Sequence, residues 1–206
     1  MSTPEELRAA YAYCRSLARL HYENFFVGSI LLPRDLRSSI AAIYAFARVA
    51  DDLADEGSVP PEQRLAALDA WEEELEACFA GAPRSQVFIA LADTVRRFSL
   101  PIAPFRALLQ AFRYDAQFRP FATFSDLLDY CRCSANPVGH LVLHLFGYRD
   151  AERQALADRI CTGLQLANFW QDVSVDAQRG PCVLAARRFA AFRAHPRGYP
   201  ERHGRR

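Results

Sequence analysis

Two pairs of aspartates, each spaced four residues apart, stand at the ends of otherwise apolar stretches of the chain. The first pair is Asp51 and Asp55, and the second is Asp172 and Asp176. In an α-helix this spacing places both carboxylates on one face, one turn apart. Their like charges repel each other, and acids near a helix C-terminus oppose the helix dipole. Because local physics disfavours this arrangement twice, we expect a bound cation to bridge the carboxylates.

The residues around the two pairs indicate which cation this is. Oxygen ligands suit Mg²⁺, with Mn²⁺ as an alternative, and such ions usually share their coordination with substrate phosphates. Gln165 and Asn168 precede the second pair on the same helix face, as Tyr44 and Arg48 precede the first. An arginine beside a metal–carboxylate cluster is suited to binding a phosphate oxygen. The alternative, that both pairs are solvated helix ends, stays open at this point. The predicted metal ligands are Asp51, Asp52, Asp55, Asn168, Asp172 and Asp176.

Helical spacing of apolar residues runs through most of the chain. The predicted helices start at Pro4 and then cover residues 36–54, 62–79, 85–98, 101–118, 125–145 and 151–175, with an interruption near Asn136 and Pro137. We expect the acids at positions 72, 73, 74 and 76 to face water. No stretch shows the alternation that is typical of strands. The sequence therefore predicts one all-α domain, residues 1–180, followed by an Arg/Pro-rich, poorly ordered tail, residues 181–206.

Composition excludes several classes of protein. A hydrophobic content of 51% and a net charge of +1 exclude disorder for most of the chain. Residues 1–180 hold 18 arginines against 23 acids, so no general basic surface for nucleic acid is expected. The six cysteines form no CxxC pair and are expected to be reduced and mostly buried. The chain shows neither a signal peptide nor a membrane-spanning run, which predicts a cytoplasmic location and leaves peripheral membrane contact open.

Other catalytic chemistries find little support in the sequence. There is no Walker A loop and no dinucleotide fingerprint, so neither ATP nor NADPH is expected as a cofactor. No nucleophile elbow occurs, and no Glu-x-x-His pairs for a di-iron site. His140 and His144 share the spacing of one helix face, but they lie in an apolar run without nearby acids. We expect them to be core or pocket residues rather than metal ligands.

Taken together, these motifs resemble the squalene/phytoene synthase family of trans-isoprenyl diphosphate synthases. The resemblance rests on the two aspartate motifs with Tyr44, Arg48 and Asn168, and it covers residues 5–180. It implies the isoprenoid synthase fold, a helical bundle around a central apolar cavity. The aspartate motifs would face each other across the cavity mouth and hold Mg²⁺ with the substrate diphosphate.

Within the family, the chain is most similar to the bacterial hydroxysqualene synthases of hopanoid-type squalene pathways. The similarity is carried by residues 21–25, 31–34, 44–48, 134–139 and 168–176. Such enzymes take presqualene diphosphate and quench the rearranged cation with water. The resemblance implies catalytic roles for Asp51, Asp55, Asp172, Asp176 and Tyr44. It implies substrate contacts for His21, Asn24, Phe25, Arg48, Tyr130, Val138, Gln165 and Asn168.

Three readings of the function remain open at this stage. The first is hydroxysqualene formation, in which aromatic faces such as those of Phe25, Tyr44 and Tyr130 would stabilise a carbocation. The second is condensation of two farnesyl or geranylgeranyl diphosphates to presqualene diphosphate, squalene or phytoene. The third is a non-catalytic remnant that at most binds isoprenoid. Other enzymes of the squalene pathway are the expected protein partners.

The tail departs from the family pattern. After Arg179 and Gly180 the family usually continues Arg-Val-Tyr-Leu-Pro and then several more helices. Here residues 181–185 read Pro-Cys-Val-Leu-Ala. Codons for these residues can be chosen so that the same bases, read one position later, encode Arg-Val-Tyr-Leu-Pro. We therefore predict that a one-base frameshift, real or a sequencing error, follows Gly180.

Overall fold

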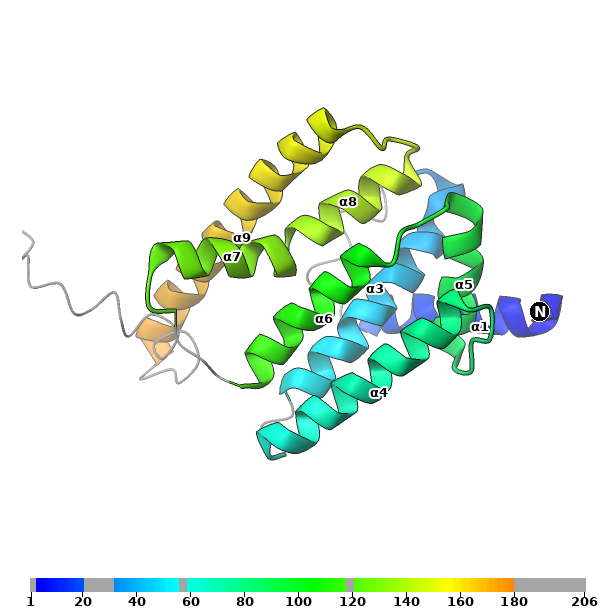
Figure 1. The fold of residues 1–206 in the computed structure, drawn as a ribbon, viewed down its shortest axis with the longest axis horizontal. Helices are drawn as coiled ribbons and strands as arrows, with labels where there is room; N and C mark the ends of the chain where they lie inside the picture. Colours follow the sequence, from blue (N-terminus) through cyan, green and yellow to red (C-terminus); the bar gives the residue numbers. More distant parts are fainter. Residues whose placement is uncertain (1–2, 21–31, 56–58, 118–120, 180–206) are drawn as a thin grey trace, which may run out of the picture.

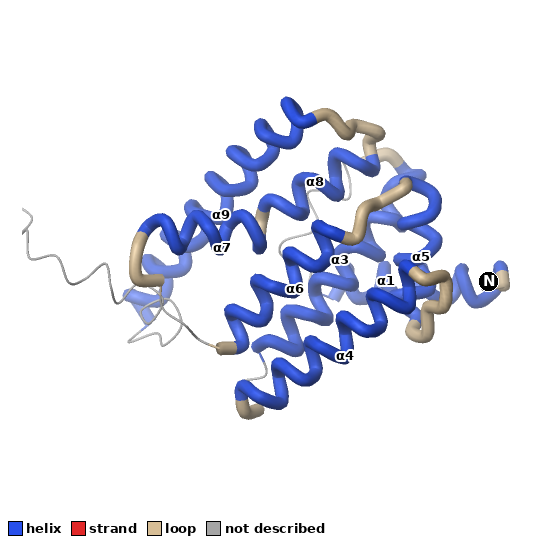
Figure 2. Tube along the Cα trace, in the orientation of Figure 1, coloured by secondary structure: helices blue, strands red, loops and turns tan. Residues whose placement is uncertain are grey.

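The described part of the chain is entirely helical. The computed structural model describes residues 3–20, 32–55, 59–117 and 121–179, and of residues 172–179 only the backbone. No strand occurs within these ranges (Figure 2), which confirms the predicted all-α class. The helices are α1 (Pro4–Leu20), α3 (Arg34–Asp55), α4 (Pro61–Phe79), α5 (Gln86–Phe98), α6 (Ala103–Ala116), α7 (Phe124–Ser134), α8 (Asn136–Leu145) and α9 (Ala151–Arg179).

The main core lies between α1, α3, α4, α5 and α6. In Figure 1 helices α3, α4 and α6 run in nearly the same diagonal direction, and α7, α8 and α9 lie along one side of this group. Phe46 of α3 is fully buried at the centre, with ring-centroid distances of 6.2 Å to Trp71, 6.0 Å to Phe88 and 5.2 Å to Phe105. Edge-to-face and stacked rings at these distances stabilise a core beyond the area they bury. The core thus holds α3 rigidly up to its last turns.

A smaller core joins α6, α7 and α9. Its buried members are Ala111, Phe121, Leu127, Tyr130, Cys131 and Phe169. Because α9 contributes Phe169, this second core fixes the part of α9 that immediately precedes the second aspartate pair. The two cores meet along α6, which contacts both groups of helices.

The boundaries of α6, α7 and α8 depend on local signals as well as on the apolar pattern. Thr123 begins α7 with a capping box, in which its hydroxyl accepts from the Asp126 amide and the Asp126 carboxylate accepts from the Thr123 amide. The predicted interruption of residues 125–145 is confirmed at Ala135, and Pro137 lies in the first turn of α8, where proline is favoured. The predicted helix 101–118 is shorter, since α6 ends at Ala116.

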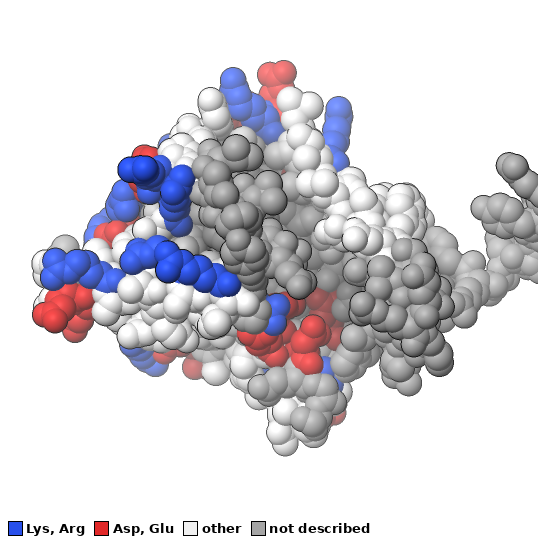
Figure 3. Space-filling view, turned by 180° about the vertical axis from the view of Figure 1, so that it is seen from behind, with Lys and Arg blue, Asp and Glu red and all other residues white. Residues whose placement is uncertain are grey.

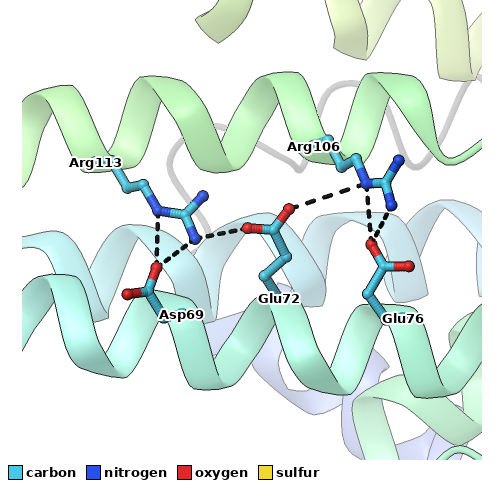
Figure 4. A network of polar contacts seen from close by, with 5 residues as sticks. All are labelled: Asp69, Glu72, Glu76, Arg106 and Arg113. Atoms are coloured by element: carbon cyan, nitrogen blue, oxygen red, sulfur yellow. Dashed lines mark hydrogen bonds and ion pairs between the residues drawn. The ribbon is translucent and has the colours of Figure 1, made fainter.

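A ladder of ion pairs links α4 to α6 (Figure 4). Arg113 Nη2 lies 2.6 Å from Asp69 Oδ1 and 2.6 Å from Glu72 Oε2, and Arg106 Nη2 lies 2.5 Å from Glu76 Oε1. The expectation that these acids face water is wrong for Glu74 and for Glu72, which are both half-buried. Glu72 lies between the two arginines. Each exposed pair is worth only about 0–1 kcal/mol, so the ladder orients the helices more than it stabilises them.

The cysteines of the described residues are all unpaired thiols. Cys14, Cys78 and Cys131 are buried, and Cys133 and Cys161 are half-buried, as expected for reduced cysteines. Cys182 and the tail to which it belongs lie outside the described residues. None of the helices described here combines the length and the apolar character that crossing a bilayer requires.

Candidate active site

The first aspartate motif forms the C-terminal end of α3. The apolar face of α3 is buried up to Ala54, which is 1% exposed, and this burial continues the helix through the acidic residues. Asp51 is half-buried, whereas Asp52 and Asp55 are exposed. The last turn of α3 holds no basic residue. The acids therefore stand at the negative end of the helix dipole, as the spacing predicted.

Arg48 lies one turn before these acids and pairs with two of them. Its Nη1 donates to Asp51 Oδ2 at 3.3 Å, and its Nη2 donates to Asp52 Oδ1. Burial alone would lower the pKa of Arg48, but the hydrogen bond to Asp52 and the charges of Asp52 and Asp51 raise it. The Nε of Arg48 is buried, and no hydrogen-bond acceptor for it occurs among the described residues. The guanidinium thus keeps one donor for a further oxygen.

Tyr44 lies one turn before Arg48 on the same face of α3 and is half-buried. Burial raises the pKa of its phenol, the Arg48 charge opposes this shift, and Asp51 and Asp52 add to it. The hydroxyl consequently stays protonated at neutral pH. It can donate a hydrogen bond beside the acidic end of α3.

The second motif lies in α9, which continues to Arg179 and so contains Asp172 and Asp176. The side chains of these two aspartates are outside the described residues. Of the residues before them, Gln165 is half-buried and Asn168 is exposed. Helices α3 and α9 both run toward the lower left in Figure 1, so their C-terminal ends lie toward the same end of the molecule. This arrangement agrees with one site built from both motifs, but it does not itself bring the carboxylates together.

An aromatic cluster stands beside this end of α9. Tyr130 of α7 is buried, with ring-centroid distances of 5.6 Å to Tyr114, 5.3 Å to Phe121 and 5.9 Å to Phe169. Its hydroxyl donates to Asp115 Oδ2 at 2.8 Å. A cleft of about 460 Å³ opens next to the cluster, lined by Gln110, Ala111, Tyr114, Asp126, Asp129, Tyr130, Arg132 and Cys133.

Several predicted site residues are not brought together by the described structure. His21, Asn24 and Phe25 lie outside the described residues. Val138 is on α8 and is 44% exposed. Within the described ranges, no three His, Cys, Asp or Glu side chains converge closely enough to hold a metal ion by themselves. The space-filling view from behind (Figure 3) shows acidic side chains gathered low on that face and arginines toward its top and left.

Sequence reasoning missed residues whose partners lie far away in the chain. Asp115 and Arg64 are buried charged residues, although each occurs in an amphipathic helix where a solvent-facing position is the usual reading. The expectation that no acid lies near His140 is wrong, because its Nε2 lies 2.7 Å from Asp158 Oδ1 of α9. Phe169 carried a usable signal, since it directly follows Asn168 in the second motif.

The fold and the site define an all-α protein in which acids end α3 and a buried aromatic cluster holds α9 just before its aspartate pair. The squalene/phytoene synthase family model matches residues 18–199. The chain belongs to this family, which confirms the resemblance and the isoprenoid synthase fold. The match includes residues 181–199, part of the predicted tail.

Solved structures and curated relatives agree with this assignment. The chain is 48% identical to the squalene synthase HpnC from Alicyclobacillus acidocaldarius, with a TM-score of 0.78 over 86% of this chain and 66% of that one. It is 32% identical to a dehydrosqualene synthase solved with a ligand, with a TM-score of 0.74 over 91% of this chain and 66% of that one. It is 35% identical to the 15-cis-phytoene synthase of Synechococcus elongatus, over 90% of this chain and 64% of that protein. The chain thus spans slightly less than two thirds of these relatives.

Proposed function

We propose that the chain acts as a Mg²⁺-dependent enzyme on isoprenoid diphosphates and converts presqualene diphosphate and water to hydroxysqualene and diphosphate. Support for the class of reaction comes from relatives that are named squalene, dehydrosqualene and phytoene synthases. The 48% identity with a bacterial squalene synthase, against 35% with a phytoene synthase, favours the squalene branch.

The chemistry of the donor set fits a magnesium ion. Carboxylate oxygens one helical turn apart match the ligands that Mg²⁺ prefers, and their mutual repulsion is relieved when a cation is bound. The residues that would hold it are Asp51, Asp52 and Asp55 of α3 with Asn168, Asp172 and Asp176 of α9. Bound there, Mg²⁺ would supply Lewis-acid stabilisation of the charge that develops on the leaving diphosphate.

The single observation that carries the proposal is the position of Arg48. Its guanidinium pairs with Asp51 and Asp52, and its buried Nε has no acceptor among the described residues. A buried donor without an acceptor costs about 1–3 kcal/mol, so an oxygen that arrives with a ligand, and toward which the partly exposed guanidinium can turn, would stabilise this position. A diphosphate oxygen satisfies the donor and its negative charge matches the guanidinium.

The aromatic cluster would contact the isoprenoid part of the substrate. The rings of Tyr114, Phe121, Tyr130 and Phe169 form an apolar wall that excludes water until the rearrangement is complete. Their negative ring faces attract a carbocation. The buried side chain of Asp115 accepts a hydrogen bond from the Tyr130 hydroxyl and so fixes the orientation of this ring.

Substrate assays test the proposal against its near alternative, head-to-head condensation of two farnesyl or geranylgeranyl diphosphates. The chain is incubated with Mg²⁺ and presqualene diphosphate, and separately with farnesyl diphosphate and with geranylgeranyl diphosphate, and products are identified by mass spectrometry. Hydroxysqualene from the first incubation and no product from the others supports the proposal. Presqualene diphosphate, squalene or phytoene from the condensation substrates favours the alternative.

We further propose that a one-base frameshift replaces the continuation of the chain after Gly180. The support is a large apolar surface at the spacing of successive helical turns. Val138 and Val142 of α8 are exposed, as is Phe146, which directly follows this helix. On α9, Leu156, Ile160 and Leu164 are exposed, the last two to 62% each. Contiguous exposed apolar side chains normally mark a surface that another element or a partner covers. Resequencing codons 178–186 tests this, and an unshifted reading of the codons for residues 181–185 refutes it.

The non-catalytic reading remains a candidate because of the same apolar surface. If the helices that cover α8 and α9 are missing, the cavity is open to water, and a carbocation would be captured early. Binding of Mg²⁺ and diphosphate without turnover is the result that would distinguish this reading from the enzymatic one.

A further inference from the structure

The C-terminal end of α3 carries more negative charge than a helix end tolerates by itself. Asp51, Asp52 and Asp55 all lie in its last two turns, and the last turn holds no basic residue. The final carbonyl groups of any helix lack partners within the helix and add the negative end of its dipole. Arg48 offsets the charges of Asp51 and Asp52 from within α3, so what this end still needs is a donor outside α3 for its final carbonyl groups.

Arg64 of α4 supplies such a contact to the end of α3. It is 4% exposed, and its Nη1 donates to the carbonyl oxygen of Ala54 at 3.0 Å. Ala54 is itself 1% exposed and lies between Asp51 and Asp55 in the sequence. A second bond, from Arg64 Nε to the carbonyl oxygen of Val59 at 2.9 Å, ties the segment that follows α3 to the start of α4.

The position of Arg64 costs α4 stability. It is the fourth residue of α4, where the positive end of the helix dipole disfavours a cation, and burying a guanidinium is costly unless it is well bonded. Both printed hydrogen bonds of its guanidinium, to the carbonyl oxygens of Ala54 and Val59, hold the end of α3 and the start of α4. The cost to α4 indicates that the role of Arg64 lies in α3.

The two arginines at this site act through different groups. Arg48 is partly exposed and pairs with the carboxylates of Asp51 and Asp52, so a ligand can draw its guanidinium away. Arg64 is buried and holds the main chain, so it stays in place whether or not a ligand is bound. The aspartate carboxylates then project from a fixed helix end.

We propose that Arg64 is a positioning residue for the metal site, fixing the last turn of α3 so that Asp51 and Asp55 present their carboxylates one turn apart. This inference rests on the proposed function, because it assumes that these aspartates hold Mg²⁺. Groups that orient metal ligands without touching the metal typically contribute ten- to hundredfold in metal affinity.

The test is a magnesium titration followed by thermal unfolding at a fixed concentration of inorganic diphosphate. The purified chain is compared with Arg64→Met, which removes every donor, and Arg64→Lys, which keeps the charge but loses the fork of donors. The matched control is Arg113→Met, which removes an arginine that bonds Asp69 and Glu72 of the same helix α4 away from the motif.

We expect Arg64→Met to need about tenfold more Mg²⁺ than the wild type for half of the full thermal stabilisation. Arg64→Lys should fall in between, and it alone decides the matter if Arg64→Met does not fold. Arg113→Met should lower the unfolding temperature without moving the magnesium midpoint. If Arg64→Lys, and Arg64→Met where it folds, keep the magnesium midpoint of the wild type, Arg64 has no positioning role. That result would not contradict the metal site itself. If the wild type is not stabilised at all, the proposed function itself fails.

Discussion

The hydroxyl of Tyr130 on α7 donates a 2.8 Å hydrogen bond to Oδ2 of Asp115 on α6, and both residues are at least nine-tenths buried. A buried carboxylate that loses a donor keeps its desolvation cost. Tyr130→Phe should therefore lower the free energy of unfolding by about 1–3 kcal/mol, measured by urea denaturation. Tyr148→Phe, at an exposed position, is the control and should change it by less than about 0.5 kcal/mol. Equal effects of the two substitutions would contradict the role of the buried bond.

Gly139 permits the close approach of α8 to α9. A Cβ at this position would lie 2.8 Å from Cys161 Sγ and 3.4 Å from Ala157 Cβ. Gly139→Ala should thus destabilise the chain by about 1–3 kcal/mol, although alanine is normally the better helix former. In a Cys161→Ala background the same substitution should become neutral or stabilising. A double-mutant cycle measures this coupling, and simple additivity of the two changes would contradict the clash.

Burial raises the pKa of the Cys78 thiol to about 12, and the nearby charge of Glu74 adds to the shift. Unfolding returns the thiol to its ordinary pKa near 9, so the folded state favours the neutral form. The stabilisation is fully present below pH 9 and is lost as the pH rises toward 12. The stability difference between wild type and Cys78→Ala should therefore shrink between pH 9 and pH 11. Urea denaturation at each pH measures it, and a constant difference would show that the thiol does not titrate as argued.

Substitutions on the exposed apolar face of α9 should affect the stability of the present chain and of an extended chain differently. Ile160 and Leu164 are each 62% exposed, so Ile160→Gln and Leu164→Gln should change the stability of this chain by less than about 0.5 kcal/mol. In a chain extended in the shifted reading frame, the same changes should cost about 2 kcal/mol or more, because these side chains would be buried. Equal effects in both chains would argue against coverage of this face by the extension.

The apolar pattern was sufficient to predict where most helices lie. Burial on one face gives a period that any amphipathic helix must show, so α3, α4, α5 and α9 could be placed within a few residues. The start of α7, where Thr123 is the N-cap, was predicted to within one residue, whereas the end of α6 was placed two residues too far along the chain. The break before Pro137 could be predicted because proline is disfavoured inside a helix but favoured in its first turn.

Only the part of the site that lies within a single helix could be predicted from the sequence. The aspartate spacing and Arg48 belong to one helix, so their proximity follows from helical geometry. Arg64, Asp115 and Asp158 reach their partners across different helices, and nothing in their local sequence distinguishes them from solvent-facing residues. Partners of this kind are set by the packing of the bundle, which the sequence pattern does not specify residue by residue.

Binding of Mg²⁺ together with inorganic diphosphate, followed as the shift in unfolding temperature, measures most directly whether both acidic helix ends serve one site. A ligand that binds only the folded state must raise this temperature. The wild type should be stabilised by the two ligands together more than by either alone, and Asp51→Asn and Asp172→Asn should each lose that gain while folding normally without ligand. Full stabilisation of either variant would show that its aspartate takes no part, and would contradict a shared site.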